Sequence, residues 1–146
     1  MNLLIDTNVI LDVLLKREPY YKDAIKITIL SEKGFISGYI SASSVTDIFY
    51  IVKKELKSKD LAFDLLKNIL KIMHVASVTE NNIYEALDLQ WDDFEDSVQY
   101  VAGQNISAKY IVTRNPKDFS DSHIKVLSPE EFINQVASQN DEGENV

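Results

Sequence analysis

Short apolar runs alternate with longer amphipathic stretches along the whole chain. The apolar runs have the length of buried strands and predict strands at residues 2–5, 35–40, 74–78, 110–113 and 124–127. The longer stretches repeat apolar residues at helical spacing and predict helices at residues 7–17, 21–33, 41–56, 59–72, 79–89 and 92–106, with a last one from 128. Because strands alternate with helices, we predict an α/β fold with a central, mostly parallel sheet of about five strands.

Residues that start or stop helices mark several of these boundaries. Pro19 follows the first predicted helix, and Gly34 follows the second. The segment 128–131 places a serine before a proline and two acids, which is typical of a helix start. The chain has no internal repeat and no linker long enough to separate two domains. We therefore expect one domain over residues 1–137, followed by an acidic, disordered tail over residues 138–146.

The composition limits the chemistry that the chain can support. The 146 residues are 45% hydrophobic and 26% charged, which is typical of a globular domain. The absence of cysteine excludes disulfides, thiolate chemistry and zinc–cysteine sites, and the two histidines lie far apart. Any metal ion must therefore be held by oxygen. We see no signal peptide and no segment long enough to cross a membrane, so we expect a cytoplasmic protein with no membrane partner.

The net charge of −8 initially argues against a nucleic-acid partner. The charge is unevenly distributed, because residues 126–146 hold five acids and no lysine or arginine. The rest of the chain is closer to neutral, and cations bound to its carboxylates would bring it closer still. The charge therefore weakens a nuclease hypothesis without removing it.

Acidic residues recur where predicted strands end and predicted helices begin. Asp6 comes directly after the first strand, and Asp118 lies in the segment after the fourth. Asp47 lies one turn into the helix that follows the second strand, and Asp96 lies in the first turn of a later helix. Ligands of open α/β sheets bind beyond the carboxyl ends of the strands, so we expect one crevice to collect these acids. Mg²⁺ or Mn²⁺ would relieve their repulsion and could polarise a phosphodiester.

Each of these acids also has a purely structural interpretation. Asp6 could cap the helix that follows it, and Asp118 could be an ordinary loop residue. Asp93 and Asp96 could be first-turn acids favoured by the helix dipole. On a helical wheel, Asp47 lies roughly opposite the apolar face, so periodicity alone favours a solvated side chain there.

Three segments of the chain carry a family resemblance. The opening LLIDTNVILDVLLKREPYY is an apolar strand followed by Asp-Thr-Asn, and ISASSVTDIFYIVKK is an acid-bearing helix. DFEDSVQYVAGQNISAKYIVTRNPKDF is a second acid-bearing helix, followed by a strand that ends in Thr-Arg. In this order the segments resemble PIN-domain proteins, over residues 1 to about 135. The resemblance implies a three-layer α/β/α fold and a PIN-like nuclease domain over residues 1–137.

The resemblance to PIN-domain proteins also implies an activity and a set of site residues. Members cleave RNA with a divalent metal, and many bacterial members are VapC-like toxins silenced by an antitoxin. We therefore expect an endoribonuclease that uses Mg²⁺ or Mn²⁺, acts on RNA, forms a homodimer and serves as the toxin of a type II toxin–antitoxin pair. By position, the resemblance gives Asp6, Asp47 and Asp96 as catalytic metal ligands, Asp93 as an assisting ligand, and Thr7 and Asn8 as substrate-binding residues of the first loop.

The fourth acidic position departs from the family pattern. Many members have an aspartate two residues after the threonine that ends the fourth strand, where this chain has Asn115. Asp118 follows three residues later, so both side chains are candidates for the fourth ligand. Arg114, between these positions, is a candidate RNA contact, whereas Lys53, Lys54 and Lys57 are better interpreted as a solvated helix face. The substitution also leaves open an alternative function, a PIN-fold interaction module that has lost catalysis.

Overall fold

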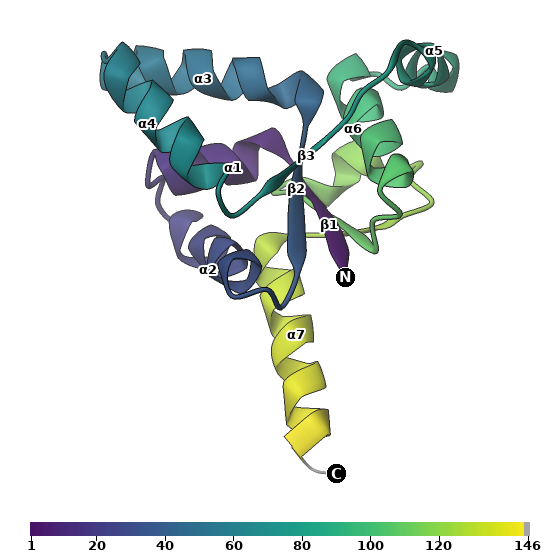
Figure 1. Ribbon diagram of the computed structural model, residues 1–146. Helices are drawn as coiled ribbons and strands as arrows, with labels where there is room; N and C mark the ends of the chain where they lie inside the picture. The colour runs from purple at the N-terminus through teal and green to yellow at the C-terminus, as the bar shows by residue number, and fades with distance from the viewer. Residues whose placement is uncertain (145–146) are drawn as a thin grey trace.

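The computed structural model describes the backbone of residues 1–144 and the side chains of residues 1–138 (Figure 1). Every predicted strand and helix is present in the predicted order. The elements are β1 (Asn2–Ile5), α1 (Thr7–Leu14), α2 (Tyr21–Glu32), β2 (Ser37–Ser41), α3 (Ala42–Leu56), α4 (Lys59–Ile69), β3 (His74–Ala76), α5 (Glu80–Leu89), α6 (Phe94–Asn105), β4 (Tyr110–Val112), the 3-10 turn η1 (Pro116–Phe119), β5 (Lys125–Leu127) and α7 (Pro129–Glu144).

The five strands form one parallel sheet in the order β3-β2-β1-β4-β5. Leu4 on the central strand β1 pairs with Tyr39 on β2 and with Ile111 on β4. The chain builds outward from β1 through β2 and β3, and then returns to the other side of β1 to add β4 and β5. The strand order therefore reverses next to β1, which is where ligands of open α/β sheets bind.

The side chains of β1 alternate between two hydrophobic clusters, because successive residues of a strand point to opposite faces of the sheet. Leu3 and Ile5 pack in a cluster with residues of α1, α2, α3, α4 and α7. Leu4 packs on the other face, with Tyr100 of α6 and Phe119 of η1. Figure 1 shows α1 to α4 on one side of the strands and α5 and α6 on the other. The predicted three-layer α/β/α fold with a parallel sheet is confirmed.

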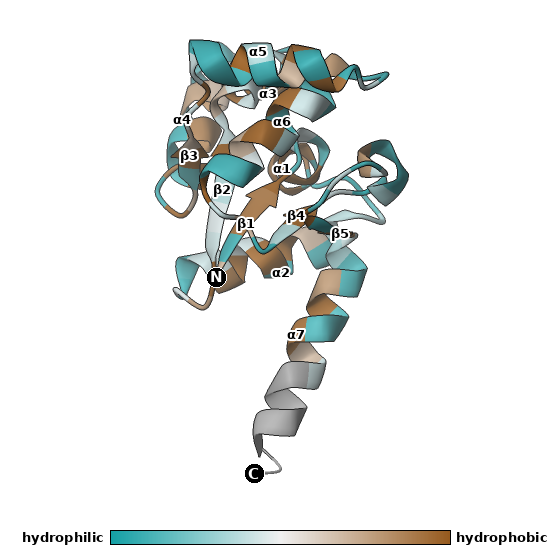
Figure 2. Ribbon diagram, turned by 90° about the vertical axis from the view of Figure 1, so that its right-hand side faces the viewer, coloured by the Kyte–Doolittle hydropathy of each residue, from teal (hydrophilic) through white to brown (hydrophobic). Residues whose placement is uncertain are grey.

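Apolar residues concentrate at the centre of the molecule, where β1 is drawn in brown in Figure 2. Leu3 and Leu4 are fully buried and Ile5 is 1% exposed, as expected for a central strand of a parallel sheet with both faces covered. Within the described part of the chain, no helix is both long and apolar enough to cross a membrane.

Several element boundaries differ from those predicted. Helix α1 ends at Leu14, three residues before the predicted end, and Lys16 then adopts a left-handed backbone conformation with φ of 52°. Gly34 follows α2 as predicted and has φ of 81°, a conformation that glycine adopts at little cost. Helix α7 is described to Glu144, and residues 145–146 lie outside the described residues, so the domain boundary at residue 137 and the tail over residues 138–146 stay predictions. The turn η1 was not predicted, because four residues leave no periodicity to detect.

Candidate functional site

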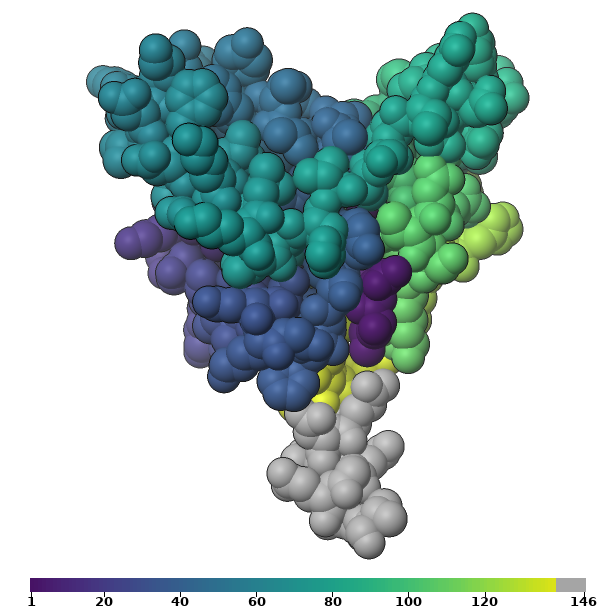
Figure 3. Space-filling model, viewed as in Figure 1, coloured from purple at the N-terminus to yellow at the C-terminus, as the bar shows by residue number. Residues whose placement is uncertain are grey.

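An acidic cleft of about 360 Å³ lies at the carboxyl edge of the sheet. In the space-filling view, the surface is hollowed between α3 and α5, above the strands (Figure 3). Segments distant in sequence meet here because the strand order reverses beside β1. The polar residues that line the cleft are Asp6, Thr7, Asn8, Asp47, Asp93, Glu95, Asp96, Gln99 and Asp118.

Asp6 lies at the bottom of the acidic cleft and is only 6% exposed. Its Oδ1 accepts a hydrogen bond of 3.0 Å from Nε2 of Gln99, and its Oδ2 accepts one of 2.8 Å from Oγ1 of Thr113. Although Asp6 directly precedes α1, its side chain makes no capping hydrogen bond to that helix. The carboxylate is therefore oriented by Gln99 of α6 and by Thr113, which directly follows β4, and it does not act as a helix cap.

Burial raises the pKa of Asp6, while the hydrogen bonds from Gln99 and Thr113 lower it. Donors at both carboxylate oxygens favour the ionised form, so these two side chains offset part of the effect of burial, and the pKa of Asp6 stays above its ordinary value. The sequence did not lead us to either residue. Gln99 lies one helical turn after Asp96 on α6, and that spacing was the signal that could have identified it.

The start of α6 contributes three more acids to the acidic cleft. Asp93 precedes α6 as its N-cap, and its Oδ1 accepts a hydrogen bond of 3.2 Å from the backbone N–H of Asp96. Burial, followed by the negative charges of Asp93, Asp6, Asp118 and Glu95, raises the pKa of Asp96 to about 7. Burial raises the pKa of Glu95 as well, with further increases from Asp47 and Asp93. Glu95 is a cleft residue that the sequence analysis missed.

Asp47 and Asp118 complete the group of acids. Asp47 is exposed on α3, as its helical wheel indicates, yet it also lines the acidic cleft, so the two interpretations of this residue are compatible. Asp118 reaches the cleft from η1. Asn115 is not among the described residues that line it, and its backbone N–H instead donates a hydrogen bond of 3.2 Å to Oγ1 of Thr113. Of the two candidates for the fourth position, the structure brings Asp118 to the other acids.

Arg114 points away from the acidic cleft. Its Nε lies 3.0 Å from Oδ2 of Asp12, which is fully buried in α1. Its guanidinium also lies over the ring of Tyr20, 4.2 Å from the centroid, in a separate pocket bordered by the starts of α2 and α7. The contact between Arg114 and Asp12 is an ion pair, but the geometry at Nε of Arg114 and Oδ2 of Asp12 is not that of a hydrogen bond. The structure thus places Arg114, predicted as an RNA contact, against a buried acid that the sequence analysis did not single out.

The side chains in the acidic cleft suit a hard divalent cation. All of its polar side chains offer oxygen, the donor that Mg²⁺ and Mn²⁺ prefer, and the amide oxygen of Gln99 is buried without a hydrogen-bond partner. None of the ion pairs among the described residues involves a cleft acid, so the mutual repulsion that raises the pKa of Asp96 is uncompensated. Among the described residues, no three acids or histidines already sit close enough together to hold an ion. The donors fit chemically, and their positions would have to adjust around the ion.

We expect Asp96→Asn to raise the melting temperature of the protein in EDTA by about 3–8 °C at pH 8. A carboxyl with a folded pKa of about 7, against an ordinary value of 3.8, destabilises the folded state once it ionises. The full shift would be worth about 4 kcal/mol, and screening by solvent reduces it to about 1–2 kcal/mol. Since the cost of the charge appears as pH rises from about 4 through 7, the gain should vanish near pH 4. Melting curves at both pH values test this, with Asp64→Asn on α4 as a surface control; equal melting temperatures at pH 8 would contradict it.

Comparisons with known proteins agree with this architecture. A family model described as a PIN domain matches residues 2–117. Ribonuclease VapC1 of Aquifex aeolicus (strain VF5) is 28% identical over 136 residues, covering 88% of this chain and 90% of that protein.

Two solved structures, each 18% identical to the chain, show the same fold. One is VapBC2 from Rickettsia felis, bound to a DNA fragment from its promoter. It has a TM-score of 0.67, and the match covers 88% of this chain and 98% of that one. A toxin–antitoxin complex from Klebsiella pneumoniae has a TM-score of 0.64, and the match covers 86% of this chain and 96% of that one. The PIN-domain model matches most of this chain, and the predicted fold is present. The chain therefore belongs to the PIN-domain family.

Proposed function

We propose that the protein is a divalent-metal-dependent endoribonuclease that hydrolyses RNA phosphodiester bonds. The observation that carries this proposal is the convergence on one cleft of carboxylates from the end of β1, α3, the start of α6 and η1, none of which takes part in an ion pair among the described residues. Membership of the PIN-domain family and the similarity to a protein named as a ribonuclease support RNA as the substrate.

In this proposal the cleft acids hold Mg²⁺ or Mn²⁺, with Asp6, Asp47, Asp96 and Asp118 as ligands and Asp93 beside them. When bound, the ion would polarise the phosphodiester and lower the pKa of a water molecule. Gln99 and Thr113 fix the orientation of Asp6 and favour its ionised form. With a pKa of about 7, Asp96 carries a proton part of the time at neutral pH and would release it on binding the ion.

We also propose that the protein is the toxin of a toxin–antitoxin pair. Two structures that share the fold of this chain support this: one is a toxin–antitoxin complex and the other is VapBC2. The relative VapC1 shares the VapC part of that name. In this proposal Thr7 and Asn8, at the rim of the acidic cleft, contact the RNA. The proposal also includes a cytoplasmic location and a homodimer. A measurement of the molecular mass of the protein in solution would test the dimer.

The direct test is cleavage of labelled RNA by purified protein. We expect cleavage with Mn²⁺ or Mg²⁺, a drop of about 100-fold or more in EDTA, and recovery when Mn²⁺ is added in excess. A parallel titration should detect Mn²⁺ binding in the micromolar-to-millimolar range that is typical of exposed carboxylate sites. Undiminished cleavage in EDTA would contradict the proposal. Absence of both cleavage and Mn²⁺ binding would favour the alternative, a PIN-fold interaction module.

A further inference from the structure

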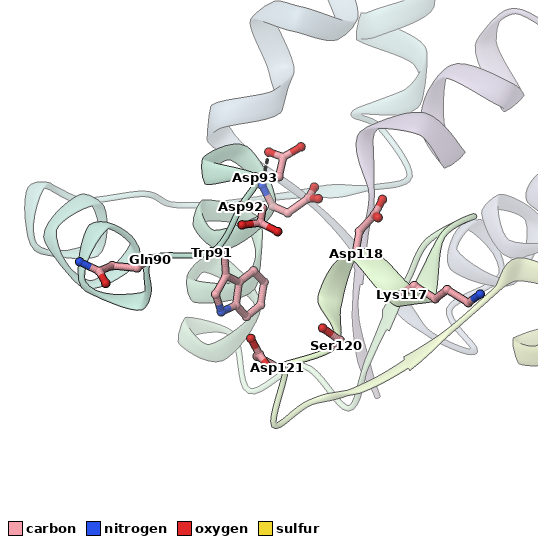
Figure 4. A pocket seen from close by; sticks show the side chains of 9 residues that line it. Gln90, Trp91, Asp92, Asp93, Lys117, Asp118, Ser120 and Asp121 are labelled. Carbon is pink, nitrogen blue, oxygen red and sulfur yellow. Dashed lines mark hydrogen bonds between the residues drawn. The ribbon is translucent and has the colours of Figure 1, made fainter.

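A second pocket, of about 290 Å³, adjoins the acidic cleft (Figure 4). The two share Asp93, Asp96 and Asp118, so whatever occupies the second pocket lies beside the proposed metal site. The segment that connects α5 to α6 forms one side, and residues 117–121 form the other. We call it the tryptophan pocket, because Trp91 lines it.

The Trp91 side chain is held firmly by other aromatic rings. Its indole stacks on Tyr100 of α6, with ring centroids 4.9 Å apart and an interplanar angle of 29°. Phe119 of η1 and the indole form a T-shaped pair, with centroids 6.0 Å apart and planes at 86°. Tyr100 and Phe119 are each 2% exposed, whereas Trp91 is partly exposed at the pocket. A rigid, half-buried indole open to a pocket is a surface on which a flat ring can stack at little entropic cost.

Two further acids lie in the tryptophan pocket and not in the acidic cleft. Asp92 comes directly after Trp91, and Asp121 lies opposite it across the indole (Figure 4). None of the ion pairs among the described residues includes either side chain. Both side chains are exposed, and a carboxylate accepts hydrogen bonds and donates none, so a ligand that contacts them in place of water must bring N–H or O–H donors.

The negative charge of the tryptophan pocket favours an uncharged nucleobase over a phosphate group as its ligand. Five aspartates and one lysine line it, an environment that repels a phosphate group unless a cation intervenes. A nucleobase carries no charge and can stack on the indole. Among the four RNA bases, guanine has two adjacent donors, N1–H and N2–H, on its Watson–Crick edge, which match the two oxygens of a carboxylate. Uracil presents two carbonyl oxygens on that edge, and these would face the aspartates unfavourably.

We propose that the tryptophan pocket binds a guanine base of the RNA, stacked on Trp91 and donating hydrogen bonds from its Watson–Crick edge to Asp92 or Asp121. Single-stranded RNA is commonly recognised through splayed bases that stack on aromatic side chains. The inference rests on the proposed RNA cleavage, because the pocket would then hold a nucleotide next to the one that is cleaved. It adds a base preference that metal-dependent cleavage alone does not require.

Trp91 allows a direct test, because it is the single tryptophan of the chain and its fluorescence reports on this pocket alone. The protein is titrated in EDTA with guanosine, inosine and uridine, with correction for their absorbance. Nucleosides lack phosphate, so the readout depends on the base. We expect saturable quenching by guanosine, binding about 10-fold weaker for inosine, which lacks the N2 amine, and no saturable quenching by uridine. Equal responses to guanosine and uridine, or none to guanosine, would overturn the proposal.

Matched variants separate stacking from base recognition. The double variant Asp92→Asn/Asp121→Asn should lose the preference for guanosine over uridine, whereas Asp88→Asn on the exposed side of α5 should retain it. In cleavage assays, Trp91→Leu should raise KM about 10-fold for RNA with guanine at the preferred position, and Trp91→Phe should restore most of the affinity. An unchanged KM in Trp91→Leu would count against the pocket.

The failure of this proposal is distinguishable from failure of the proposed nuclease function. Metal-dependent cleavage with no base preference and no guanosine quenching would overturn only the guanine pocket. Guanosine quenching that depends on Asp92 and Asp121, in a protein that cleaves no RNA, would support the pocket and count against the nuclease.

Discussion

Replacing Asp6 by asparagine will lower metal-dependent RNA cleavage by about 100-fold or more, with little change in the fold. Asparagine keeps the size of the side chain and one acceptor oxygen, so the hydrogen bond from Gln99 or the one from Thr113 can persist, and the hydroxyl of Thr113 can turn to accept from the new amide. The lost feature is a negative charge at the bottom of the acidic cleft, next to the proposed ion.

The Asp6→Asn experiment compares single-turnover cleavage rates at saturating Mn²⁺ and melting curves for the wild-type protein and the variant. Asp64→Asn, an exposed charge change on α4, provides the control and should cleave at the wild-type rate. A fall in rate together with a collapse of the melting transition would point to misfolding. A folded Asp6→Asn protein that cleaves normally would exclude Asp6 as a metal ligand.

Most of the fold could be predicted because the local patterns and the tertiary structure agree. The apolar run at residues 2–5 matches β1, a strand buried on both faces, and glycine at residue 34 marks the end of α2. Errors occurred where local signals are weak. Helix α1 ends early because the backbone becomes left-handed at Lys16. Lysine has no preference for that conformation, so the sequence does not predict the turn.

The acidic site was predictable in part, and for different reasons at each residue. Asp6 follows a buried strand in a parallel sheet, so topology alone places it at the ligand-binding edge. Asp47 could not be placed by periodicity, since it is exposed and its role depends on α6 lying opposite α3. Gln99 and Thr113 depend on contacts across 93 and 107 residues of sequence, which a single sequence does not reveal.

The contact between Asp12 and Arg114 could not be predicted from the local pattern around either residue. Asp12 lies among apolar residues of α1, where a charge has no local explanation. Arg114 lies between two positions of the acidic motif, so proximity in sequence suggested a role in the cleft. The intervening structure turns the two side chains toward each other, and the pair joins α1 to the segment after β4. These are the segments that carry Asp6, Thr113 and Asp118.

Replacing Arg114 by methionine should therefore lower the free energy of unfolding by about 2–3 kcal/mol, equivalent to a fall in melting temperature of about 5–10 °C. Breaking a buried ion pair leaves the remaining charge unpaired, and Asp12 is fully buried. We expect a value at or just below the lower end of the usual range of about 3–5 kcal/mol, because Arg114 is 22% exposed and Asp12 can take up a proton. Denaturant unfolding curves provide the measurement.

The pH dependence of the Arg114→Met deficit identifies its cause. Burial raises the pKa of Asp12, and the charges of Arg114 and Arg17 lower it, so loss of Arg114 should raise it further. A protonated Asp12 needs no partner, and the deficit should therefore shrink at pH 5 and grow toward pH 8. The double variant Asp12→Leu/Arg114→Met removes both charges and should regain most of the lost stability. If Arg114→Met is instead as stable as the wild type but binds RNA more weakly, Arg114 contacts RNA and the pair is not a structural link.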